Sequence, residues 1–68
     1  MNGFVVFVDS SKDGEYFSDA ASAMRYAAFM EQLGCDAIFY NARMVEGRVV
    51  REERVPEQFM RACVNLGL

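Results

Sequence analysis

The feature that most constrains the fold is a run of five aromatic and β-branched residues near the start of the chain, Phe4-Val5-Val6-Phe7-Val8. Such residues favour strands, and a run without polar alternation is typical of a strand buried on both faces. We therefore predict a strand here, in the centre of a sheet. A chain of 68 residues has room for one such sheet and its covering helices, so we expect a single domain over residues 1–68.

A second strong signal is the segment 20–33, which is rich in Ala and Met and contains neither Gly nor Pro. Ser18 or Asp19 offers a helix N-cap before it. Its apolar positions recur at helical spacing, at Ala20, Ala23, Met24, Ala27, Met30 and Leu33. We predict a helix that packs this stripe on the sheet. Tyr26 and Phe29 lie off the centre of the stripe and either widen it or are partly exposed.

Turn residues and shorter apolar runs predict the other elements. The turn cluster Ser10-Ser11-Lys12-Asp13-Gly14 precedes Glu15-Tyr16-Phe17, which we expect to form a short second strand. A strand from Ala37 to about Val45 and its return over 48–54 form a hairpin around Glu46-Gly47.

Pro56 suits the first turn of a second, short helix. We expect this helix to present one face formed by Phe59, Cys63 and Leu66, with Met60 beside them. The fold class is therefore α+β. We predict two layers: a three- to four-stranded, mainly antiparallel sheet, one long helix on a face, and a short C-terminal helix.

The sequence lacks recognisable catalytic machinery. It contains no His, which removes the commonest general base and metal ligand, and its glycines do not form a phosphate-binding loop. Asp9, Ser11, Asp13 and Gly14 match the start of a calcium loop, but its twelfth position is Ala20 rather than a carboxylate. We expect no enzymatic activity, no cofactor and no metal.

Cys35 and Cys63 are expected to be reduced and mostly buried, with a single disulfide between the two helices as the alternative. The start of the chain lacks the basic flank of a signal peptide, and no apolar run approaches the length of a membrane span. We therefore expect a cytoplasmic protein.

Charge is unevenly distributed over the chain, whose net charge is −3. Up to Tyr40, six acidic residues stand against two basic ones; beyond it, four glutamates stand against five arginines. Carboxylates gathered on one surface could occupy an arginine-lined groove that normally receives phosphates. We predict such a partner-binding surface from Asp9, Asp13, Glu15, Asp19, Glu31 and Asp36.

Two alternatives remain open. The arginine-rich hairpin could follow a nucleic-acid backbone, with one aromatic residue for stacking, through Tyr40, Arg43, Arg48, Arg51 and Arg54. The chain could instead be a structural subunit that forms a homodimer through a sheet edge, or through a face bearing Phe59, Met60 and Leu66.

In general character the chain resembles the anti-CRISPR proteins, which are small phage-encoded inhibitors of bacterial defence. The resemblance lies in a single acidic domain, the lack of a catalytic set, and the strand, turn, helix and hairpin layout from Phe4-Val5-Val6-Phe7-Val8 through Glu46-Gly47. It implies a non-enzymatic inhibitor, in the cytoplasm of a bacterial host cell, that binds a larger protein or ribonucleoprotein complex. It carries over no site residues.

Overall fold

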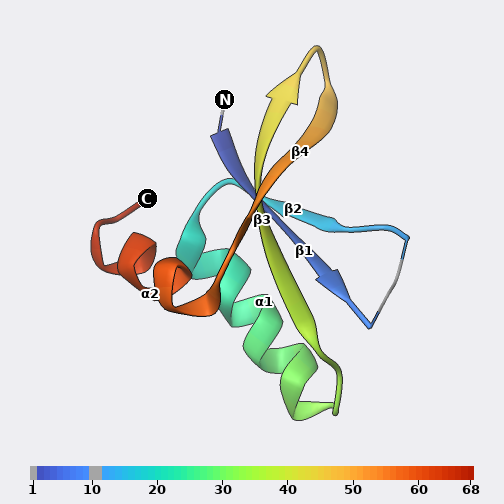
Figure 1. Ribbon diagram of the computed structural model, residues 1–68, viewed down its shortest axis with the longest axis vertical. Coiled ribbons are helices and arrows are strands. Elements are labelled where there is room, and N and C mark those ends of the chain that lie inside the picture. Colours follow the sequence, from blue (N-terminus) through green and yellow to red (C-terminus); the bar gives the residue numbers. More distant parts are fainter. Residues whose placement is uncertain (1, 10–11) are drawn as a thin grey trace.

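The computed structural model describes residues 2–9 and 12–68, and it shows an α+β domain with a four-stranded sheet and two helices (Figure 1). The predicted turn residues Ser10 and Ser11 lie outside the described residues. In chain order the elements are β1 (Asn2–Val8), β2 (Glu15–Phe17), α1 (Ala20–Gln32), β3 (Ala37–Val45), β4 (Arg48–Val55) and α2 (Glu57–Asn65).

The strand order is β2-β1-β3-β4, and every neighbouring pair is antiparallel. The apolar run of β1 therefore lies inside the sheet, as predicted, while β2 and β4 form its edges. The fold class and element order are confirmed. No helix among the described residues is long and apolar enough to cross a membrane.

Both helices pack on one face of the sheet and enclose the core (Figure 1). Every second residue of β1 points into this core, beginning with Phe4 and Val6. The other fully or nearly buried members are Ala20, Ala23, Ala27, Phe39, Val55 and Met60. Because three alanines face the sheet, α1 can approach it closely.

The predicted stripe of α1 is correct except at its end. Leu33 is 64% exposed because it is the C-cap residue, where the chain leaves the helix to turn towards β3. Of the two undecided aromatics, Tyr26 widens the packed face, with its ring centroid 5.3 Å from that of Phe17. Phe29 is exposed.

The predicted face of α2 is wrong at Phe59 and Leu66 and correct at Cys63. Met60 is fully buried and Cys63 and Val64 pack beside it, whereas Phe59 is 55% and Leu66 is 74% exposed. The helix enters from β4 through Pro56, which is its N-cap residue, and this entry sets the face that meets α1 and the sheet. Met60 is therefore unavailable to a dimer contact on this helix, whereas Phe59 and Leu66 remain exposed.

Candidate functional site

The sheet has a second face that carries neither helix. Residues directly opposite each other in an antiparallel pair share a face, and Val5 lies opposite both Tyr16 and Tyr40. Phe7 lies opposite Ile38. These side chains alternate with the core residues and so point away from the helices. We call this surface the open face: Val5, Phe7, Tyr16, Ile38, Tyr40, Ala42, Met44, Val49, Arg51 and Arg54.

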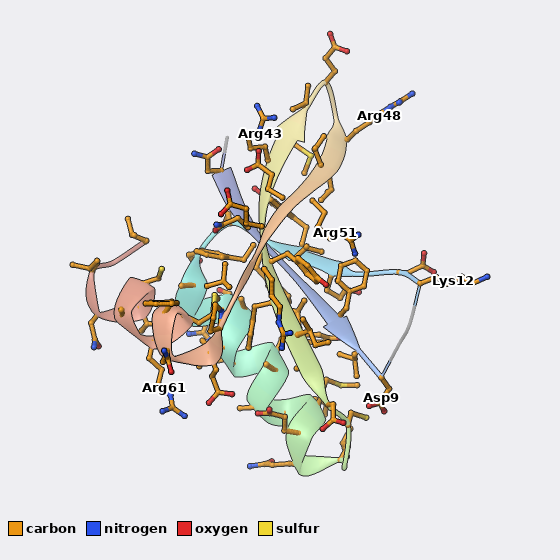
Figure 2. All side chains as sticks on the ribbon, viewed as in Figure 1. Asp9, Lys12, Arg43, Arg48, Arg51 and Arg61 are labelled. Atoms are coloured by element: carbon orange, nitrogen blue, oxygen red, sulfur yellow. The ribbon has the colours of Figure 1, made fainter. Side chains whose placement is uncertain are left out.

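An arginine stacked on two aromatic rings forms the centre of the open face. The Arg51 guanidinium carbon lies 4.7 Å from the ring centroid of Tyr40 and 5.3 Å from that of Phe7. The two rings meet edge to face, with centroids 5.5 Å apart and planes at 88°. Such contacts attract a cation to the ring faces, so the guanidinium is held in place before any partner arrives. Figure 2 shows Arg51 beside the centre of the sheet.

A β-bulge determines which arginines share this face. Tyr40 pairs with Arg54 and Ala42 pairs with Arg51. Between these two pairs β4 advances by three residues while β3 advances by two, which is a β-bulge. Strict alternation would send residues 51 and 54 to opposite faces. The extra residue in β4 brings Arg54 to the same face as Arg51, beside Tyr40.

The predicted arginine hairpin is therefore divided between two faces. Tyr40, Arg51 and Arg54 lie on the open face, whereas Arg43 lies on the helix side, where its Nε donates to Glu52 Oε2 at 2.7 Å. Arg48 begins β4 opposite Val45 and also lies on the helix side. Figure 2 shows Arg43 and Arg48 towards the hairpin tip, away from Arg51.

The predicted acidic surface is spread around the molecule. Asp9, Glu31 and Asp36 lie near the C-terminal end of α1, whereas Asp19 is the N-cap at its other end. A 13-residue helix is about 20 Å long, so these groups do not share one patch. Asp13 lies in the loop before β2, and Glu15 is the first residue of β2.

Two of these carboxylates accept hydrogen bonds from backbone N–H groups and so stabilise the fold. Asp9 Oδ1 accepts from the Asp36 backbone N–H at 2.7 Å, and the Asp9 N–H donates to the Asp36 carbonyl at 3.0 Å. The backbone hydrogen bond from Asp36 lowers the pKa of Asp9, with a second contribution from the Cys35 thiol. Asp19 accepts from the Ser22 N–H at 2.7 Å, and this hydrogen bond lowers the pKa of Asp19.

Both cysteines are free, so the alternative of a disulfide is wrong. Each is partly exposed rather than buried, although Cys63 packs against the core. The side chain of Cys35 hydrogen-bonds to the Asp9 carboxylate, which raises the pKa of the thiol. Within the described ranges no cluster of three potential metal ligands is present.

A hollow lies on the helix side of the sheet, beside the end of α2. It has a volume of about 300 Å³, and amide and hydroxyl groups from Asn2, Asn41 and Ser18 line it together with Cys63 and Leu68. That volume is at the lower limit for small-molecule sites, and its lining carries no ionised side chain. The open face therefore offers the stronger candidate site.

Sequence reasoning missed Phe7 as a site residue. Phe4 and Phe7 belong to the same apolar run but point to opposite faces of the strand. Because the residues on both faces are apolar, the run does not indicate which face meets the helices.

Comparison of the chain with protein-family models, with curated proteins and with solved structures found no match.

Proposed function

We propose that the chain is a non-enzymatic protein-binding module that contacts an acidic segment of its partner through the open face. The observation that carries this proposal is the Arg51 guanidinium held over Tyr40 and Phe7 on a face that neither helix covers. Arg54 lies opposite Tyr40 in the strand register and on the same face as Arg51. Two arginines next to half-buried aromatic rings can pair with carboxylates while the rings exclude water around them.

The composition of the open face supports a protein partner. Its strand residues include tyrosine, phenylalanine, methionine and arginine, the types enriched at the centres of protein interfaces. Ile38 and Val49 add exposed apolar surface. Among the strand residues that the register assigns to this face there is no Asp or Glu, although the whole chain carries a net charge of −3.

Nucleic acid is less well supported as the partner. Binding to phosphates draws on several cations, and the open face offers only Arg51 and Arg54 from its strands. Arg43, which the sequence placed in the same set, is paired with Glu52 on the other side. The net negative charge of the chain also opposes the approach of a polyanion.

Inhibition of a bacterial defence complex is the more specific form of this proposal, and it rests on the general resemblance in the sequence. Two surfaces could then make the contact: the open face or the predicted acidic residues. A useful test separates them. Asp9 and Asp19 are unsuitable for it because their side chains hold backbone groups, so charge reversal there would also disturb the fold.

The test is a tagged pull-down from a bacterial lysate that carries an active CRISPR system, with and without nuclease. Three double variants accompany the wild type. Arg51→Glu with Arg54→Glu reverses the open face, Glu15→Lys with Glu31→Lys reverses part of the acidic set, and Arg25→Glu with Arg61→Glu is the control. The control makes the same charge change as the first variant, on exposed helix positions.

We expect a stoichiometric, nuclease-resistant complex that survives in the control and the acidic variant and is lost in the open-face variant. Loss of the complex in the acidic variant alone would show that the acidic residues, and not the open face, contact the partner. Recovery of nucleic acid alone, sensitive to nuclease, would favour the nucleic-acid alternative. Circular dichroism of each variant checks that the fold is retained.

A further inference from the structure

The outer edge of β4 is the longest unpaired strand edge in the described part of the chain. β4 pairs with β3 on one side only, and all of its residues except Val55 are exposed. The end of the β3–β4 hairpin projects beyond the two helices (Figure 1). Natural edge strands are usually protected by Pro, by charged side chains or by bulges, because free backbone groups recruit other strands. β4 has no Pro, its charged side chains are of both signs, and its bulge follows Arg51, so residues 48–51 keep a regular register with β3. The ion pair with Arg43 places the Glu52 side chain on the same face as Arg48 and Val50.

Exposed apolar side chains accompany this free edge. Val49 is 44% exposed and Val50 is 38% exposed, on opposite faces of the hairpin, and Val45 is 39% exposed next to them. Burial of such side chains against another strand is favourable. The hairpin end thus combines unpaired backbone groups with apolar surface.

We propose that two copies of this chain pair antiparallel through the 48–52 edges of their β4 strands, with Val50 opposite Val50. In an antiparallel pair of identical strands, one residue lies opposite its own copy and the others pair outward from it. Opposite residues share a face. With Val50 at the centre, Arg48 lies opposite Glu52 of the second copy and Val49 lies opposite the second copy's Arg51. The symmetry repeats both pairs.

Charge selects this register over its neighbours. Centring the pair on Arg48 or on Arg51 would set two arginines directly opposite each other, which is destabilising. Centring it on Val49 avoids that repulsion but forms no opposite-charge pair, because Arg48 then lies opposite Val50 and Arg51 opposite Gly47. Only the Val50 register within 48–51 forms two opposite-charge pairs between the copies. Glu52 can take part because Arg43 bonds its Oε2, and its second carboxylate oxygen remains for Arg48.

This pairing would join the two sheets into one of eight strands, with both open faces on the same side. Arg51 of each copy would lie near the junction, so a partner could contact both. The inference rests on the edge of β4 and not on the proposed function, because a dimer would form whether or not the open face binds a protein.

The test is sedimentation velocity of the full chain over a concentration series up to millimolar protein. We expect a reversible monomer–dimer equilibrium for the wild type. Arg48→Glu alone and Glu52→Arg alone each replace two attractive pairs by two repulsive ones, so each should weaken the dimer on the order of tenfold or more. An equimolar mixture of these two variants restores opposite charges at both pairs and should recover a heterodimer. Arg61→Glu, with the same charge change on α2, is the control and should leave the equilibrium unchanged.

Backbone hydrogen exchange provides a readout that does not depend on the charge pairs. Amides within 48–52 that are exposed in the monomer should become protected as the concentration rises, with no such change in β2. A wild type that stays monomeric at millimolar concentration overturns the proposal. So does a dimer that survives both single variants, or a mixture that remains monomeric.

Discussion

At the scale of single residues, Gly3 marks a point where two strands and an aromatic ring approach closely. A Cβ at this position would meet the Phe17 carbonyl oxygen and lie 2.6 Å from the Tyr16 hydroxyl oxygen. That hydroxyl is buried and has no hydrogen-bond partner in the described part of the chain. The ring of Tyr16 therefore lies across β1 at the one position without a side chain.

We predict that Gly3→Ala destabilises the protein by about 1–3 kcal/mol, the usual cost of overpacking. The added methyl group would push Tyr16 off the open face or separate β1 from β2. Chemical denaturation followed by circular dichroism measures the effect. Asn2→Ala, one residue away and exposed, is the control and should stay close to wild type. Equal stabilities for the two variants would show that the close approach is not rigid.

Cys35 gives a second prediction at this scale. Its thiol donates to the Asp9 carboxylate, so the thiol form is favoured and its pKa is raised. In a Cys63→Ala background, Asp9→Asn should lower the pKa of Cys35, because the negative charge beside the thiol is removed. The rate of alkylation by iodoacetamide between neutral and mildly alkaline pH should then increase. An unchanged pH profile would mean that the thiol does not interact with this carboxylate in solution.

At the scale of elements, α2 shows how a short helix chooses its buried face. Its apolar residues cover more than half of its circumference, and the structure buries Met60 while leaving Phe59 exposed. Helical periodicity alone favoured Phe59, Cys63 and Leu66, because they are spaced by about one turn. The path from β4 through Pro56 rotates the helix so that Met60, Cys63 and Val64 meet the core.

This choice predicts a large difference between neighbouring substitutions. Met60→Ala should cost about 2–5 kcal/mol of unfolding free energy, because it leaves a cavity in the core where α2 packs against α1 and β3. Phe59→Ala should change stability little, although the phenylalanine is the larger side chain. Thermal and urea unfolding of both variants provide the measurement. A greater loss in Phe59→Ala than in Met60→Ala would contradict the packing of α2.

The bulge in β4 acts at the same scale. Residues 51 and 54 are three apart, so simple alternation in a strand would separate their side chains. One additional residue in β4 instead places both arginines on the open face, next to Tyr40. The bulge in β4 thus places together the two arginines on which the proposed contact depends.

At the scale of the whole molecule, two aspartates accept hydrogen bonds from backbone N–H groups and so stabilise the fold. Asp9 ties the end of β1 to the start of β3, and Asp19 caps α1. The pKa of each lies below the ordinary value of 3.8, because backbone N–H groups stabilise the carboxylate. The unfolded chain therefore binds protons more readily than the folded protein as the pH falls through this range.

We predict that Asp9 and Asp19 make their full contribution to the free energy of unfolding at pH values above the ordinary aspartate pKa. This contribution declines as the pH falls below that pKa and through the lowered pKa values of the folded protein. Asp9→Asn with Asp19→Asn keeps an acceptor oxygen at both sites but removes their titration. The double variant should show a shallower decline of unfolding free energy in acid than the wild type. Urea titrations at a series of acidic pH values measure the two slopes, and equal slopes would contradict the prediction.

The sequence by itself determined the elements and their order. β-branched and aromatic runs, the Ala-rich segment with its Asp19 cap, and the turn at Glu46-Gly47 act through local preferences, which the residues carry wherever the chain goes. The central position of Phe4–Val8 also followed from its lack of polar alternation.

Only the tertiary structure decided how the two faces of the sheet differ. The apolar run of β1 presents apolar side chains on both faces of the strand. The packing of the helices buries Phe4 and Val6 in the core and leaves Phe7 on the open face. The same non-local pairing placed the bulge, divided the arginines, and dispersed the acidic residues over both ends of α1. Register and packing depend on strands far apart in the chain, and no local pattern contains that information.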